Sequence, residues 1–168
     1  MVPSSKRLAH TIAQQITHYP FQQESGLIVE LGAGTGAITA ALAQQKNSQQ
    51  ELIIIEKSVK MAHHLKQRFP TLTTIQGDAQ VLQQLLSPYQ TPVQVIISSL
   101  PLRSLQKTIV QRIGTEVENL LKTGGLFVQY TYSLWGKPTV LSEHLKLVNQ
   151  YWVWQNLPPA RIDVYHYQ

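Results

Sequence analysis

Short apolar runs alternate with amphipathic stretches along most of the chain. The apolar or β-branched runs cover residues 27–31, 51–56, 71–76, 93–97 and 126–132. Runs of this kind, bounded by turn residues, are typical of buried parallel strands. Helical periodicity fills the intervals, over residues 35–45, 58–68, 78–88 and 104–122. This order predicts an α/β fold with a mostly parallel, doubly wound sheet and helices on both faces.

The two ends of the chain depart from this alternation. Near the N-terminus, Leu8, Ile12 and Ile16 share one helical face. Residues 145–154 and 161–167 are aromatic and β-rich, which predicts a C-terminal antiparallel strand pair. We expect one domain over residues 1–168, in which residues 1–20 form an N-terminal helix. That helix could cover a bound ligand as a lid, or lie on an anionic membrane.

Composition narrows the function classes. The 168 residues suffice for one core, and the absence of cysteine excludes disulfides, zinc-finger spacing and a thiol nucleophile. No apolar run approaches the roughly 18–20 residues that span a bilayer, so a cytoplasmic protein is the default expectation. The net charge of +5 favours anionic partners such as nucleic acid or a membrane face, although the basic residues are scattered, as in many soluble proteins.

A glycine-rich turn follows the first predicted strand. It reads Glu30-Leu31-Gly32-Ala33-Gly34-Thr35-Gly36 and lies where doubly wound sheets bind ligands. The spacing differs from the G-x-G-x-x-G of dinucleotide enzymes, whose pyrophosphate meets a helix N-terminus. A carboxylate beside the turn instead suits a cationic ligand such as the sulfonium of S-adenosylmethionine. An NAD-type oxidoreductase is therefore a poor alternative.

Two more acids follow the next strands. Glu56 ends the second strand, where an acid accepts hydrogen bonds from ribose hydroxyls; the alternative is a surface acid paired with Lys57 or Lys60. Asp78-Ala79 follows the third strand, where a carboxylate would meet an adenine amino group. Asp78 could equally be a helix cap, and both roles could hold together. We expect Glu56, Lys57, Asp78 and Ala79 to contribute to cofactor binding.

Residues 27–133 resemble motifs I to III of the class I S-adenosylmethionine-dependent methyltransferases in order and spacing. The resemblance implies a Rossmann-like sheet and that cofactor, with Ser98 adding to its site. After the fourth strand, relatives that methylate adenine place Asn/Asp-Pro-Pro-Tyr or Asn-Leu/Ile-Pro-Tyr, whereas this chain reads Ser98-Ser-Leu-Pro-Leu-Arg103. Leu102 replaces the stacking aromatic, a platform worth roughly 1–3 kcal/mol to a base. An aliphatic lining suits a lipid better.

Three segments resemble the bacterial phospholipid N-methyltransferases, which methylate phosphatidylethanolamine and are distantly similar to ribosomal RNA adenine dimethyltransferases. They are Val2-Pro3-Ser4-Ser5, Ser98-Ser-Leu-Pro-Leu-Arg-Ser-Leu105 and Asn156-Leu-Pro-Pro-Ala-Arg161. The resemblance implies an amine phospholipid substrate and possible peripheral contact with an anionic membrane face. We expect Ser4 and Ser5 to meet the methionine carboxylate of the cofactor.

Methyl transfer needs a deprotonated amine held in line with the sulfonium. We expect Ser99, the Leu100 carbonyl, Tyr130 and Tyr132 to orient that amine, although both tyrosines could be ordinary strand aromatics. The expected substrate-binding residues are Pro101, Leu102, Arg103 and Arg161. The two arginines could bind a lipid phosphate or be solvated surface residues.

Other features carry weaker expectations. Trp135, Trp152 and Trp154 could be interfacial anchors or packing residues. The six histidines show no ligand spacing, so we expect no metal. An RNA adenine N6-methyltransferase is the second hypothesis, with nucleic acid the less favoured partner, and a non-catalytic cofactor-binding partner subunit is the third.

Overall fold

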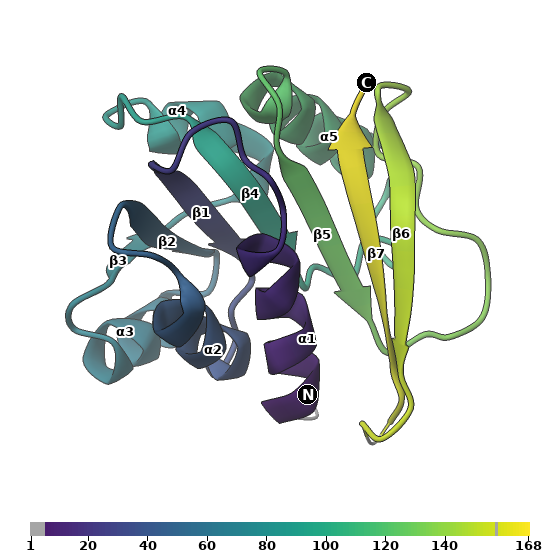
Figure 1. The fold of residues 1–168 in the computed structure, drawn as a ribbon, viewed down its shortest axis with the longest axis horizontal. Helices are drawn as coiled ribbons and strands as arrows, with labels where there is room; N and C mark the ends of the chain where they lie inside the picture. Colours follow the sequence, from purple (N-terminus) through teal and green to yellow (C-terminus); the bar gives the residue numbers. More distant parts are fainter. Residues whose placement is uncertain (1–5, 157) are drawn as a thin grey trace.

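The computed structural model describes residues 6–156 and 158–168, and the described strands form one seven-stranded sheet (Figure 1). Its order is β3-β2-β1-β4-β5-β7-β6, parallel from β3 to β5, with β7 antiparallel to both β5 and β6. The strands are β1 (Gly26–Leu31), β2 (Gln50–Glu56), β3 (Thr73–Gln76), β4 (Val93–Ser98), β5 (Leu126–Thr131), β6 (Leu145–Val153) and β7 (Ala160–Tyr167). The predicted fold class and C-terminal antiparallel pair are confirmed.

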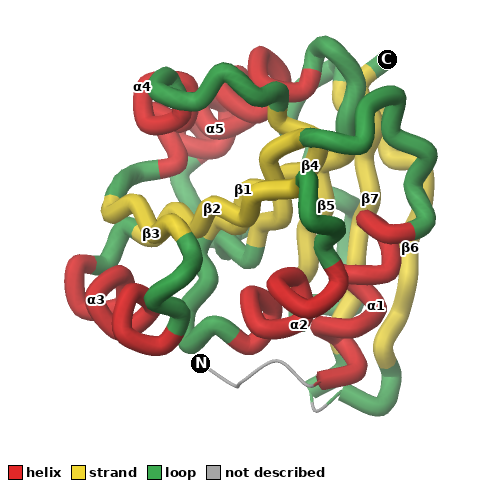
Figure 2. The backbone as a smooth tube through the Cα atoms, turned by 60° about the vertical axis from the view of Figure 1, so that its left-hand side comes forward, coloured by secondary structure: helices red, strands yellow, loops and turns green. Residues whose placement is uncertain are grey.

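Helices cover both faces of the sheet. They are α1 (Lys6–Thr17), α2 (Ala37–Gln45), α3 (Val59–Arg68), α4 (Leu82–Leu86) and α5 (Lys107–Leu121), with a 3-10 turn η1 (Ala79–Val81) before α4. Figure 2 shows α1, α2 and α3 on one side of the sheet and α4 and α5 on the other. Alternate strand residues divide between two apolar layers: Ile28 packs towards α1 and α2, and Val29 towards α4 and α5.

Helix α1 is amphipathic, and the sheet covers its apolar face. Leu8, Ile12 and Ile16 are all buried against the layer that contains Ile28. That packing leaves no apolar face on α1 for a membrane. The described helix packs on the face of the sheet, and the role of a lid over the cofactor stays a prediction. Ser4 and Ser5 lie outside the described residues. No described helix is long and apolar enough to cross a membrane.

Three predicted boundaries are wrong, each for a local reason. The first crossover helix begins at Ala37 rather than residue 35, because the left-handed backbone of Gly36 (φ 86°) precedes it. Asp78 caps a 3-10 turn instead of a continuous helix to Pro88. The helix predicted over 104–122 begins at Lys107, since residues 99–106 form a turn in which the Leu102 N–H donates to the Leu100 carbonyl.

Candidate functional site

The glycine turn lies at the carboxyl end of β1. Gly32, Gly34 and Gly36 all have positive φ angles, a region that favours glycine. A Cβ on Gly32 would lie 3.0 Å from Leu100 Cδ2 and 3.1 Å from Ser99 Oγ. The turn therefore packs directly against the segment that follows β4, and Gly32 also lines the smaller cavity described below.

Glu30 is a buried carboxyl at this turn, only 2% exposed. The Thr39 hydroxyl donates to its Oε2 at 2.6 Å, whereas its Oε1 has no hydrogen-bond partner among the described residues. Burial raises the pKa of Glu30 to about 7; the Thr39 bond lowers that pKa and the nearby Glu56 raises it. A cationic ligand would compensate this carboxylate, so the residue fits S-adenosylmethionine.

Glu56 is buried at the end of β2. It accepts hydrogen bonds from the Gly34 N–H at 3.5 Å and the Ser58 N–H at 2.9 Å. The alternative of a surface acid paired with a lysine is wrong, because Glu56 is buried and Lys57 pairs with Asp78 at 2.8 Å. Its carboxylate is thus held beside the glycine turn.

Asp78 performs the capping role that was one of its two expected functions. It accepts from the Gln80 N–H at 2.9 Å and pairs with Lys57. Partial burial opposes ionisation, but the Lys57 ammonium and the Gln80 hydrogen bonds hold the pKa of Asp78 below its ordinary value. Its carboxylate is therefore an anionic acceptor at this edge of the sheet.

A cavity of about 140 Å³ joins these strand ends. Five residues predicted for the cofactor line it: Gly32, Glu56, Lys57, Asp78 and Ala79. Apolar side chains from β1, β2 and α5 complete the wall, as a flat adenine ring requires. The glycine cradle, the unpaired Glu30 oxygen and this cavity together fit S-adenosylmethionine.

Three other residues predicted to bind the cofactor make packing contacts or hydrogen bonds that hold the backbone around this cavity. Ala33 packs against Leu65 of α3, and the Thr35 carbonyl accepts a hydrogen bond from Arg68. The buried Ser98 hydroxyl accepts from the Leu100 N–H at 3.2 Å. These contacts hold the turns on either side of the cavity.

The residues predicted to receive the amine are already engaged. The single hydrogen of the Ser99 hydroxyl is shared between the Leu31 and Gly32 carbonyls, which leaves the lone pairs of Oγ as acceptors. The Leu100 carbonyl accepts from Gln129 Nε2 at 2.9 Å and from the Leu102 N–H at 2.8 Å. With two donors on that carbonyl, Ser99 Oγ is the better placed acceptor of the pair.

Gln129 is a site residue that the sequence reasoning missed. Its side-chain amide is buried, 5% exposed, and Nε2 donates to the carbonyls of Leu100 and Tyr130. Two carbonyl partners fix the orientation of the amide, because the opposite orientation would set oxygen against oxygen. Gln129 Oε1 then has no partner among the described residues. A polar residue within the apolar run 126–131 was the available signal.

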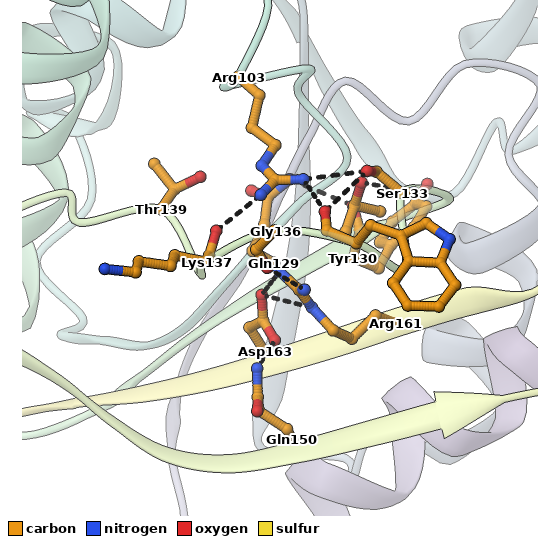
Figure 3. Close-up of polar contacts among 12 residues, drawn as sticks. Arg103, Gln129, Tyr130, Ser133, Gly136, Lys137, Thr139, Gln150, Arg161 and Asp163 are labelled. Carbon is orange, nitrogen blue, oxygen red and sulfur yellow. Dashed lines mark hydrogen bonds and ion pairs between the residues drawn. The ribbon is translucent and has the colours of Figure 1, made fainter.

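A second cavity, of about 460 Å³, lies beside the first. All four predicted substrate residues line it together: Pro101, Leu102, Arg103 and Arg161. Gln129 and Asp163 also contribute (Figure 3). Leu100 and Pro101 line both cavities, so the segment after β4 separates the smaller cavity from the larger one.

The two arginines of this cavity differ in their partners. Arg161 is buried and pairs with Asp163 at 2.8 Å, so the expectation of a solvated residue is wrong for it (Figure 3). Arg103 is exposed, and its bonds go to neutral oxygens of Ser133 and of the backbone at Trp135 and Lys137. No described carboxylate is within ion-pair distance of Arg103, so its charge is available to an anion.

Tyr130 and Tyr132 lie away from both cavities. Tyr130 packs in the layer beneath α1, with its ring edge-on to Tyr132 at 6.4 Å. Gln129, the preceding residue, points to the opposite face. This placement favours the alternative of ordinary strand aromatics. No described cluster of three acids or histidines could hold a metal.

Comparison with known proteins defines the class. A family model described as "Methyltransferase domain" matches residues 28–125, which is more than half of the chain. The chain belongs to this family of methyltransferase domains, and S-adenosylmethionine is its cofactor.

Individual relatives agree with that assignment. The chain is 29% identical over 164 residues to an ornithine lipid N-methyltransferase from Singulisphaera acidiphila, covering 95% of this chain and 83% of the relative. Two solved structures share the fold: TrmN from Thermus thermophilus (TM-score 0.74, 15% identity, 97% of this chain and 49% of TrmN) and a TehB-like methyltransferase from Corynebacterium glutamicum (0.68, 17%, 95% and 88%). The chain thus spans about half of TrmN.

Proposed function

We propose that this methyltransferase transfers the methyl group to the amine of a membrane lipid whose head group also carries an anion. The observation that carries the proposal is the pair of cavities that share Leu100 and Pro101. One cavity has the acids that suit the cofactor, and the other has an exposed arginine without an acidic partner. The similarity to an ornithine lipid N-methyltransferase supports a lipid substrate.

Two head groups have the required chemistry. Phosphatidylethanolamine combines a primary amine with a phosphate, and ornithine lipid combines one with a carboxylate. Either anion can accept the two parallel hydrogen bonds that an arginine fork offers, and Arg103 is the exposed candidate. The 29% identical relative favours the carboxylate-bearing lipid as the first substrate to test.

The expected role of this chain is to orient and desolvate the amine. Bound S-adenosylmethionine supplies an electrophilic methyl group. The amine is protonated near neutral pH and must lose a proton before its lone pair can attack. Ser99 Oγ can accept a hydrogen bond from the amine, while Gln129 holds the Leu100 carbonyl beside it. Alignment of two bound reactants can supply about 7–11 kcal/mol of the barrier.

Adenine methylation in RNA is the weaker candidate. A stacking platform is missing, because the residue at that position is Leu102 and its side chain is buried. Among the described residues, none of those that line either cavity is aromatic.

The test supplies methyl-labelled S-adenosylmethionine with three acceptors in parallel: ornithine lipid, phosphatidylethanolamine and ribosomal RNA. We expect label in the organic phase, and Arg103→Met should raise KM for the lipid at least tenfold with cofactor affinity unchanged. Lys122→Met, at an exposed position at the end of α5, is the matched control. Label in RNA alone, or in none of the acceptors despite tight cofactor binding, would refute the proposal.

A further inference from the structure

Four large exposed apolar side chains lie on the segments that neighbour the residues lining the 460 Å³ cavity. They are Trp135 (85% exposed), Val140 (81%), Trp152 (44%) and Trp154 (66%), here called the tryptophan rim. Large apolar side chains exposed together mark an interaction surface more often than isolated ones do. We propose that the tryptophan rim inserts into the interfacial region of a lipid bilayer and brings the cavity to the membrane surface; this inference rests on the proposed function.

Contacts in the structure connect the rim to the cavity. Trp135 and Val140 belong to the loop between β5 and β6, whose residues Ser133 and Thr139 line the cavity. Trp152 is the strand partner of the lining residue Arg161, which donates to the Gly136 carbonyl. Trp154 follows β6, which runs parallel to β5 and ends at the same edge of the sheet (Figure 1).

The backbone that presents these side chains is anchored at several points. Arg103 binds the carbonyls of Trp135 and Lys137, and the Tyr165 hydroxyl donates to the Thr139 carbonyl at 2.9 Å. A Cβ on Gly114 of α5 would lie 2.1 Å from the Leu141 carbonyl oxygen, so the loop packs tightly on that helix. The rim side chains therefore point to solvent from a fixed backbone, as a docking surface requires.

The chemistry of the rim fits a bilayer better than it fits RNA. Tryptophan is enriched at membrane interfaces, where its ring is buried and its N–H stays hydrated. The segments 133–142 and 152–160 contain one lysine and no acidic residue. An RNA surface would need a series of cations for the phosphates, whereas the rim has Lys137 and the nearby Arg103.

Intrinsic fluorescence gives a direct test, because the three rim tryptophans are all the tryptophans of the chain. We expect vesicles of phosphatidylethanolamine and phosphatidylglycerol to shift the emission to shorter wavelength, and brominated acyl chains to quench it. The measurement needs neither cofactor nor turnover. Emission that stays unshifted with vesicles would overturn the proposal. So would a shift caused by single-stranded RNA instead, or by concentration-dependent dimers.

Variants separate docking from catalysis. Trp135→Ser combined with Trp154→Ser should weaken vesicle partitioning at least tenfold and leave methylation of a dispersed short-chain lipid unchanged. Val59→Ser removes a similarly exposed apolar side chain on α3 and should leave partitioning unchanged. Vesicle binding without lipid methylation would refute the proposed function alone. Methylation of dispersed lipid with no loss of vesicle binding in the double variant would refute the rim alone.

Discussion

At the scale of single residues, the site depends on two buried polar atoms that have no partner among the described residues, Glu30 Oε1 and Gln129 Oε1. Burying such groups unpaired costs free energy, so a folded protein retains them where a ligand or a role compensates. They lie on adjoining parts of the site, one at the cofactor turn and one on the wall of the larger cavity. Each leads to a prediction.

Glu30→Gln should change the pH dependence of both the affinity for S-adenosylmethionine and the stability of the fold. With a pKa of about 7, Glu30 becomes anionic as pH rises through 7, so wild-type affinity for S-adenosylmethionine should increase over that interval. Since the folded pKa exceeds the unfolded value of 4.5, the stability of the ligand-free protein should fall between pH 4.5 and 7, by on the order of 3 kcal/mol. Glu30→Gln should remove both dependences. Calorimetric titration and urea unfolding at several pH values measure them, and parallel profiles for the two proteins would contradict the assignment.

Gln129→Met should lower kcat roughly tenfold while the dissociation constant of S-adenosylmethionine changes less than twofold. The reason is that Gln129 holds the Leu100 carbonyl, and one hydrogen bond contributes about 1–1.5 kcal/mol. Gln111→Met makes the same chemical change at an exposed position on α5 and should have no effect. Equal losses of kcat and cofactor affinity in Gln129→Met would indicate a general structural defect instead.

At the scale of elements, the sequence predicted the strands and most helices because apolar periodicity is local. It did not predict the neighbours of Gln129, since these depend on which strand lies beside β5. The insertion of β7 between β5 and β6 places Asp163 opposite Gln129 and Arg161 opposite Thr131. The engagement of the Leu100 carbonyl by Gln129 depends on the pairing of β4 with β5, which the sequence does not show. Arg161 and Asp163 are two residues apart on one strand, a spacing that allows their contact, but their burial depends on the neighbours of β7.

The buried ion pair between Arg161 and Asp163 on β7 leads to a prediction about stability. Arg161→Met leaves the buried Asp163 carboxylate without its guanidinium, and breaking a buried pair in this way costs about 3–5 kcal/mol. We expect Tm to fall by roughly 10 °C. Lys57→Met breaks the more exposed pair with Asp78 and, measured without cofactor, should cost less than about 1 kcal/mol. Equal melting temperatures for the two variants would show that the Arg161 pair does not stabilise this edge of the sheet.

At the scale of the whole molecule, β1, β2, β4 and β5 end at one edge of the sheet (Figure 1). The residues that line the two cavities follow these strand ends or lie beside them. Open α/β sheets bind ligands at this edge. The smaller cavity is lined by β1, β2 and α5 together with the segments that follow β3 and β4, so it exists only when the chain is folded. Cofactor binding must therefore stabilise the whole fold.

This linkage predicts a thermal shift with a defined dependence on Glu56. At one hundred times its dissociation constant, S-adenosylmethionine should add about 2.7 kcal/mol to the free energy of unfolding and raise Tm by roughly 5–10 °C. Glu56→Ala removes the carboxylate that we propose accepts hydrogen bonds from the ribose hydroxyls, worth about 1.5–3 kcal/mol each, so at the same concentration the shift should fall to roughly 1–2 °C. Lys60→Ala, an exposed change on α3, should keep the full shift. NAD should give none, because the Glu56 carboxylate accepts a hydrogen bond from the Gly34 N–H of the glycine turn and would repel a pyrophosphate there. A shift with NAD that Glu56→Ala abolishes would mean that the glycine turn binds a dinucleotide.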